Sequence, residues 1–278
     1  MRRLFIPVIA SLCLWGACGP SSKPVSNNTK PITVRRNEIK AYYQKAKVLG
    51  CFVLYDDSAK TYTICNDSML NQAFSPASTF KICNSLIGLE TGVIPNADFV
   101  LKWNGVKNPN PNWNHDQDMT EAIKNSTVWY YQELARRVGG RQMKYWLDKV
   151  PYGNADTSGG IDQFWLHGGL RITPMRQIEF LKRLHDNTLP FSRRNMNIVK
   201  DILVLGDSAG IVLRGKTGWA VREKEKDQTG WFVGYVEKKG KVFYFANCIY
   251  SHDLDNPDFV SARKEIAIQA LHDLKILE

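Results

Sequence analysis

After its first residues, the 278-residue sequence has no apolar run long enough to cross a bilayer as a helix, which takes about 20 residues. It has no dense run of basic residues either, although its formal net charge is +10. The excess charge therefore predicts a basic, solvated surface and no nucleic-acid partner. There is no internal repeat. With 44% hydrophobic and 23% charged residues, the sequence predicts one folded unit, with one or two lobes around a buried core.

The six cysteines form no C-x-x-C pair, which argues against a structural zinc site, and we expect no bound metal. Two of them, Cys51 and Cys65, flank a polar segment at 56–60 that predicts a hairpin turn. A turn centred on Ser58 places these cysteines opposite each other, within reach of a disulfide. A shift of one residue puts them on opposite faces, so two reduced core thiols are an equal alternative.

The first 18 residues resemble an export signal. A positive start at Arg2 and Arg3 precedes an apolar stretch over 4–15 that is too short to span a bilayer. Small residues before Cys18 suggest lipoprotein processing, with a lipid on Cys18 as the one membrane contact; ordinary signal cleavage is the alternative. Residues 19–31 are rich in Pro, Ser, Asn and Lys and predict a flexible tether. The protein is therefore expected in the periplasm, in solution or held by that lipid.

Short runs of β-forming residues lie near both ends of the sequence, and helical patterns lie between them. The expected strands are 48–55, 61–65, 211–216, 231–237 and 242–249. The expected helices run from Pro76 to Gly92, over 119–138 and 141–149, from Thr173, and over 193–205 and 257–277. A long irregular loop is expected over 153–169. This order predicts an α+β fold: an antiparallel sheet built from both termini and flanked by helices, plus a mostly helical lobe, with a ligand cleft between them.

Ser78-Thr79-Phe80-Lys81 puts a hydroxyl and an amine three residues apart, on one face of an expected helix. Serine is a weak nucleophile that needs an adjacent base, and the start of a helix favours developing negative charge. The motif alone is not specific, because a second S-x-x-K at 261–264 fits an ordinary helix surface.

Three further short motifs gain meaning only as a set. Lys216-Thr217-Gly218 ends an expected strand. There the lysine cation and the threonine hydroxyl can bind a carboxylate, and the glycine lets a ligand come close to the backbone. Ser126-Thr127-Val128 lies between two helical patterns, where Ser126 can relay a proton or cap a helix. Tyr152-Gly153-Asn154 by itself predicts a turn.

In their order along the chain, S-x-x-K, S-x-V, Y-G-N, F-W-L at 164–166 and K-T-G resemble the class D β-lactamases, the oxacillinase-type serine enzymes. The resemblance covers about residues 40–278 and includes flanking segments at 75–81, 88–92, 132–137 and 230–235. It implies a catalytic domain over 32–278 with the serine β-lactamase and penicillin-binding fold. It also implies hydrolysis of β-lactam antibiotics through a serine acyl-enzyme.

The resemblance implies a role for each matched residue. Ser78 attacks the lactam carbonyl, Ser126 lies beside the leaving nitrogen, and Lys81 is the general base. Lys81 carries a carboxyl group from carbon dioxide, as N6-carboxylysine, which Trp165 holds; no other cofactor is implied. The physics agrees, because burial among apolar groups favours the neutral amine that this reaction needs. The implied substrate-binding residues are Val128, Leu166, Lys216, Thr217, Gly218, Trp219 and Arg263.

Within that set, Lys216, Thr217 and Arg263 hold the substrate carboxylate. The backbone N–H groups of Ser78 and Trp219 form the oxyanion hole, and Val128 and Leu166 wall the pocket. The sequence departs from the family pattern at Cys83, where proline is usual, at 167–169 and over the charged segment 220–229. These departures bear on substrate range.

Two other functions share part of this pattern. A penicillin-binding transpeptidase or carboxypeptidase has the same serine, lysine and K-T-G, but its second motif normally ends in Asn where Val128 stands. An antibiotic-sensing module is acylated and stays acylated. Its relatives follow several membrane helices, for which this sequence has no segment. Turnover separates an enzyme from both alternatives.

Overall fold

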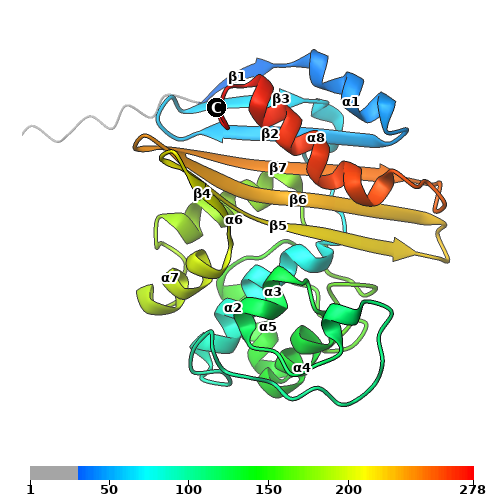
Figure 1. Cartoon of the computed structure of the whole chain (residues 1–278), viewed down its shortest axis with the longest axis vertical. Helices are drawn as coiled ribbons and strands as arrows, with labels where there is room; N and C mark the ends of the chain where they lie inside the picture. Colours follow the sequence, from blue (N-terminus) through cyan, green and yellow to red (C-terminus); the bar gives the residue numbers. More distant parts are fainter. Residues whose placement is uncertain (1–30) are drawn as a thin grey trace, which may run out of the picture. The chain divides into compact units, whose positions relative to one another are not determined.

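Seven strands form one sheet in the order β1-β3-β2-β7-β6-β5-β4, in a computed structural model that describes residues 31–278 (Figure 1). The strands are β1 (Ile32–Arg35), β2 (Leu49–Asp56), β3 (Thr61–Cys65), β4 (Val204–Ser208), β5 (Ile211–Arg222), β6 (Asp227–Lys238) and β7 (Lys241–Ser251). All neighbours are antiparallel except β1 and β3. The predicted sheet from both termini is confirmed. The predicted export signal, Cys18 and the tether up to residue 30 lie outside the described residues.

Both faces of the sheet are covered, which explains why its central strands are continuously apolar. In β2, Cys51 and Val53 belong to one buried cluster, whereas Phe52 and Leu54 belong to the other. Side chains alternate between the two faces of a strand, so a strand buried on both sides needs apolar residues at every position. The helix α8 (Phe259–Asp273) covers one face with α1 (Lys40–Lys45), and α6 (Pro174–His185) packs on the other.

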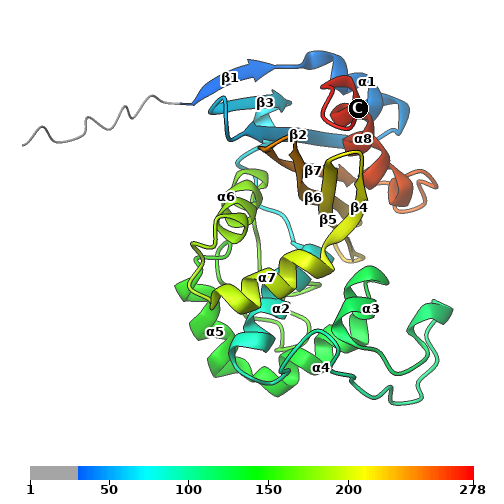
Figure 2. The same cartoon turned by 60° about the vertical axis from the view of Figure 1, so that its left-hand side comes forward.

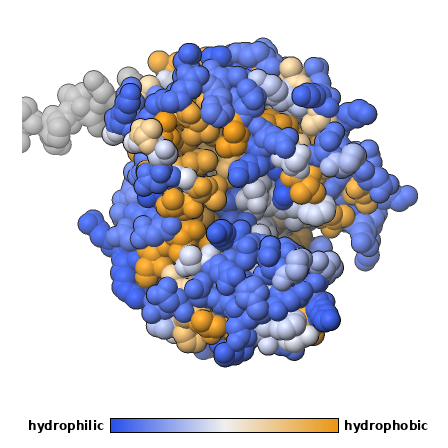
Figure 3. All heavy atoms as spheres, in the orientation of Figure 1, coloured by the Kyte–Doolittle hydropathy of each residue, from blue (hydrophilic) through white to orange (hydrophobic). Residues whose placement is uncertain are grey.

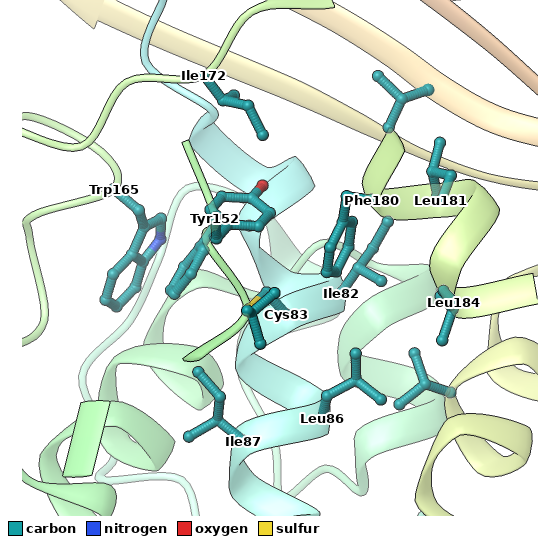
Figure 4. Packing of buried hydrophobic residues seen from close by; sticks show 14 of the residues in the cluster. Ile82, Cys83, Leu86, Ile87, Tyr152, Trp165, Ile172, Phe180, Leu181 and Leu184 are labelled. Atoms are coloured by element: carbon teal, nitrogen blue, oxygen red, sulfur yellow. The ribbon is translucent and has the colours of Figure 1, made fainter. Parts of the chain in front are cut away.

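The remaining helices gather beyond the β5 edge of the sheet, as both views show (Figures 1 and 2). They are α2 (Lys81–Glu90), α3 (Met119–Lys124), α4 (Val128–Val138), α5 (Gly140–Lys149) and α7 (Arg193–Ile202). At their centre, α2 is buried along nine of its ten residues. Figure 4 shows Cys83, Leu86 and Ile87 of α2 in this core. A Cβ on Gly88 would lie 2.7 Å from a methyl carbon of Leu134, so the glycine allows α4 to pack closely.

Several element boundaries differ from the sequence prediction for local reasons. The predicted helix over 119–138 is two helices, because Ser126 has a left-handed φ of 56°. The predicted helix over 193–205 ends at Ile202, and the following residues form β4, which pairs with the start of β5. Strand β5 continues six residues past Lys216, to Arg222. No helix within residues 31–278 has both the length and the apolar character needed to span a membrane.

The predicted pairing of Cys51 with Cys65 is wrong. The loop between β2 and β3 has four residues, since Asp56 pairs with Thr61, and the Asp56 carboxylate accepts the N–H groups of Ser58 and Ala59. The resulting register places Phe52 opposite Cys65 and Cys51 opposite Cys248. The two cysteines therefore face different sides of the sheet, and all four cysteines of residues 31–278 are free, buried thiols.

Candidate active site

Ser78 lies in a 3-10 turn, Ala77–Phe80, that leads directly into α2. A 3-10 turn has three residues per turn, so the side chains of Ser78 and Lys81 are eclipsed on one side of it. Ala77 has a positive φ of 49°, and its N–H donates to the carbonyl of Trp165 at 3.1 Å. The Ser75 hydroxyl, just before this turn, donates to the carbonyls of Trp165 and Leu166 and does not cap the helix. The turn is thus tied to the loop that carries Trp165.

Lys81 is fully buried, and its Nζ lies 2.6 Å from the Ser78 hydroxyl oxygen. The same Nζ donates to the Ser126 carbonyl at 3.0 Å and lies 3.3 Å from its hydroxyl. No carboxylate of the described residues forms a salt bridge with it. Burial lowers the pKa of Lys81 well below its ordinary value of 10.5, and the nearby Lys216 lowers it further. The amine is therefore poised to be neutral beside the serine that it contacts.

Ser126 connects two lysines. It lies in the turn between α3 and α4, where its left-handed backbone turns the side chain towards α2 and β5. Its hydroxyl accepts a hydrogen bond from Lys216 Nζ at 2.9 Å. This chain of contacts brings the side chains of Ser78, Lys81, Ser126 and Lys216 together.

The K-T-G segment lies on a free edge of the sheet. Pairing of β4 with β5 ends at Arg214, so residues from Gly215 onward have no strand on that side. A Cβ on Gly218 would lie 2.9 Å from the carbonyl of Pro76, which explains the glycine where β5 passes the Ser78 turn. Burial, with Arg263 nearby, lowers the pKa of Lys216 to about 7. A cavity of about 500 Å³ lies beside Lys216 and Thr217, and Figure 3 shows a hollow between the sheet and the helices below it.

Arg263 reaches this edge from α8. Its Nε donates to the Val260 carbonyl at 2.7 Å, and one terminal nitrogen donates to the Gly218 carbonyl at 3.1 Å. Its guanidinium also lies 5.9 Å from the ring centre of Trp219, which is exposed. Burial lowers the pKa of Arg263 to about 10, so it is charged at neutral pH. The structure thus brings Lys216, Thr217, Trp219 and Arg263 together.

Trp165 is buried under the Ser78 turn, and its indole Nε1 has no hydrogen-bond partner among the described residues. Its ring packs against Phe80 and Phe164, with centroids 5.4 and 4.9 Å away, and Figure 4 shows it near the start of α2. A buried donor without an acceptor is costly, about 1–3 kcal/mol. Leu166 and the half-buried Val128 line the same apolar core. The arrangement leaves an N–H available to an acceptor.

The sequence prediction missed two side chains around the Ser78 turn and Lys81. The ring of Tyr131 lies 5.5 Å from Lys81 Nζ, and its hydroxyl is hydrogen-bonded to Ser85. Gln177, on α6, donates to the Thr79 hydroxyl at 2.8 Å and so supports the Ser78 turn. Both belong to helical patterns that predict only core packing. In the described part of the chain, no group of His, Cys, Asp and Glu could hold a metal ion.

Comparisons with known proteins agree with this geometry. Residues 37–272 match the family described as penicillin binding protein transpeptidase domain. The chain is 38% identical to β-lactamase OXA-48 of Klebsiella pneumoniae over 237 residues, 85% of this chain and 88% of that protein. It is 39% identical to the regulatory protein BlaR1 of Bacillus licheniformis over 213 residues, 77% of this chain but only 35% of that protein. The solved class D β-lactamase YbXI from Nostoc is 42% identical, with a TM-score of 0.82 over 87% of this chain and 100% of that one.

Proposed function

Because the chain belongs to the class D β-lactamases, we propose that it hydrolyses β-lactam antibiotics through an acyl-enzyme on Ser78, with a carboxylated Lys81 as general base. The observation that carries the proposal is the buried Lys81 amine, whose pKa is lowered by burial and which lies 2.6 Å from the Ser78 hydroxyl oxygen. A serine hydroxyl becomes nucleophilic only beside a group that can take its proton. Lys81 is the group that lies there.

Two features of the site fit a carboxyl group on Lys81. Only a neutral amine can take up carbon dioxide, and burial holds Lys81 towards that form. The added group is an anion that needs hydrogen-bond donors, and Trp165 has a buried N–H without an acceptor. When present, this carboxylate supplies a base for both acylation and deacylation. Trp165 would hold it, and Val128 and Leu166 would limit the water around it.

Ser126 and Lys216 are placed to manage the leaving group. The Ser126 hydroxyl lies between the two lysine amines, 3.3 Å from Lys81 and 2.9 Å from Lys216. It can donate its proton to the lactam nitrogen as the C–N bond breaks, and it can regain one from Lys216. A pKa of about 7 suits Lys216 to that exchange, because a proton donor works best when its pKa is near the working pH.

The free edge of β5 orients the substrate. The substrate carboxylate is assigned to the Thr217 hydroxyl and to the basic side chains of Lys216 and Arg263, neither of which forms a salt bridge with a carboxylate among residues 31–278. The lactam carbonyl then lies at the other end of K-T-G, where the N–H groups of Ser78 and Trp219 are assigned to its developing negative charge. Such preorganised donors contribute about 10²–10³-fold each in other acyl-transfer enzymes.

Turnover of a chromogenic cephalosporin tests the proposed reaction directly. We expect many cycles per enzyme molecule, with the signal continuing long after one equivalent is consumed. The similarity to BlaR1, a regulatory protein, gives the sensor alternative its support. A single stoichiometric burst, followed by a stable adduct, would favour a sensor or a penicillin-binding transpeptidase over an enzyme that hydrolyses the antibiotic.

Replacing Trp165 with Phe should make activity depend on added bicarbonate. The change removes the indole donor but keeps an aromatic ring in the core, so the group on Lys81 loses a hydrogen bond worth about 1.5–3 kcal/mol to a charged acceptor. At mildly acidic pH in degassed buffer, the variant should deacylate slowly and recover with bicarbonate. Carbon-13 bicarbonate should give a carbamate signal in the resting wild-type enzyme.

A matched control is Trp146→Phe, because Trp146 also has a buried, unpartnered Nε1 but lies on α5. That variant should respond to bicarbonate as the wild type does. If neither the wild type nor Trp165→Phe responds to bicarbonate, and no carbamate signal is found, Lys81 acts as a free amine.

Export to the periplasm with a lipid on Cys18 completes the proposal. The apolar stretch, the small residues before Cys18 and the polar tether support it. Replacing Cys18 with Ser should release the protein from the membrane fraction into the soluble periplasm. Equal solubility of parent and variant would show that the lipid is absent.

A further inference from the structure

Arg171 is a half-buried arginine with an unusual set of partners. It follows the Trp165 loop, and one terminal nitrogen donates to the carbonyls of Gly168 and Leu170 at 2.7 and 2.8 Å. Arg214 and Arg222, which are also half-buried, are paired with Glu237 and Asp227. No carboxylate of residues 31–278 lies within 4.0 Å of Arg171. Arg263 has the same pattern: two backbone carbonyls and no carboxylate.

The backbone around Arg171 is held firmly. Its N–H donates to the Asn154 side chain at 2.9 Å, and the N–H of Asn154 donates back to the Arg171 carbonyl at 3.0 Å. The Asn154 amide also donates to the Gly169 carbonyl at 3.0 Å. A guanidinium anchored in this way loses little freedom when an anion binds, which favours recognition. Its remaining N–H groups have no partner in the described part of the chain.

This guanidinium lines a cavity of about 580 Å³ between the loop after Trp165 and the β5–β6 turn. His167 and Arg171 form one wall, and residues 221–225 form the other. Burial lowers the pKa of Arg171, and the neighbouring Arg222 lowers it further. Asp156, Glu225 and Asp227 attract it from beyond ion-pair distance, and the carboxylate of Asp227 is already bound by Arg222 and Tyr250. Arg171 is therefore a sheltered cation with open N–H groups.

The direction of β5 shows which part of a substrate approaches this cavity. The carboxylate of a bicyclic β-lactam is assigned to Lys216 and the lactam carbonyl to Trp219, three residues further along β5. The acylamino side chain is attached next to that carbonyl, on the side away from the ring carboxylate. It therefore extends along the free edge towards Arg222, about 10 Å beyond Trp219 at 3.3 Å per residue. The cavity lies at that end.

We propose that Arg171 forms a second anion subsite, which recognises a carboxylate on the acylamino side chain of the substrate. The inference rests on the function proposed above and narrows its substrate class. Arg263, beside Gly218 and Trp219, and Arg171, beside residues 221–225, are then two carbonyl-anchored arginines along the β5 edge, one for each carboxylate of a dianionic penicillin. Arg222 contributes positive potential from beside Arg171 while it stays paired with Asp227.

The test compares benzylpenicillin with its α-carboxy derivative, which differ only by the side-chain carboxylate. The quantity compared is kcat/KM for the α-carboxy derivative divided by kcat/KM for benzylpenicillin. We expect this ratio to be about tenfold lower in Arg171→Gln than in the wild type, because one hydrogen bond to a charged group is lost. The change should lie mainly in KM. Arg171→Lys should keep part of the preference. Arg183→Gln is the matched control, because Arg183 is also half-buried and carbonyl-bound but lines a different cavity; its ratio should equal that of the wild type.

The other possible outcomes reject either the subsite or the proposed hydrolysis. Equal losses for both penicillins in Arg171→Gln would show that Arg171 only braces the loop and would overturn the subsite. If Arg171→Gln does not fold, the ratio of the wild type is measured against salt, which screens exposed and half-buried charges. A ratio that does not fall with rising salt overturns the proposal. Failure of the wild type to turn over either penicillin would instead reject the proposed hydrolysis, and the subsite with it.

Discussion

Replacing Ser78 with Ala should lower β-lactam turnover by about 10⁴-fold or more, as for loss of the nucleophile in other serine acyl-transfer enzymes. The Ser78 hydroxyl lies 2.6 Å from Lys81 Nζ, closer than the Ser126 hydroxyl at 3.3 Å, and Ser126 is assigned to the leaving group instead. Steady-state hydrolysis of a chromogenic cephalosporin measures the loss. Thermal unfolding should change little, because one buried oxygen atom is removed.

A covalent adduct locates the same nucleophile. A slowly hydrolysed penicillin should modify Ser78 in the wild type and leave Ser78→Ala unmodified, as read by mass spectrometry of peptides. Ser261 provides the control, since it begins a second S-x-x-K on the exposed side of α8. Ser261→Ala should behave as the wild type; an adduct on Ser261 would contradict the assignment.

Replacing Lys81 with Ala should slow acylation by about 10²–10⁴-fold, the usual contribution of a general base. Lys81 is the group in contact with the Ser78 hydroxyl, and the next amine, Lys216, reaches Ser126 instead. Stopped-flow measurement of acyl-enzyme formation isolates this step from deacylation. Ser261→Ala, in the second S-x-x-K motif, should acylate at the wild-type rate. Acylation of Lys81→Ala at an undiminished rate would mean that another group takes the proton.

The local part of the site could be predicted from sequence because it depends on short spacings. Ser78 and Lys81 lie three residues apart, and any helical turn brings them together. The approach of Ser126 to Lys216 involves residues 90 apart; only the order of the motifs, through the family resemblance, pointed to it. The form of the turn was not predictable, because the Ser75 hydroxyl binds carbonyls of the Trp165 loop instead of capping the helix.

The sheet illustrates the same limit. Alternation and composition indicated strands near both termini, yet the pairing of Cys51 depended on whether the hairpin loop has an even or an odd number of residues. The Asp56 side chain stabilises the four-residue loop through two backbone N–H groups. Likewise, β5 extends past Lys216 to Arg222 because β6 pairs with it along its whole length, and the charged, turn-like composition corresponds only to the turn over 223–226.

The two sheltered lysines behind Ser78 make the resting protein less stable than its core would allow. The pKa of Lys216 is 10.5 in an unfolded chain and about 7 in the folded protein. Between these values the unfolded chain holds more protons, so the free energy of unfolding rises with pH and the full penalty applies below 7. At about 1.4 kcal/mol per pKa unit, the cost is a few kcal/mol. An anion bound beside Lys216 offsets part of it, so the occupied protein resists heat and proteolysis better than the empty one.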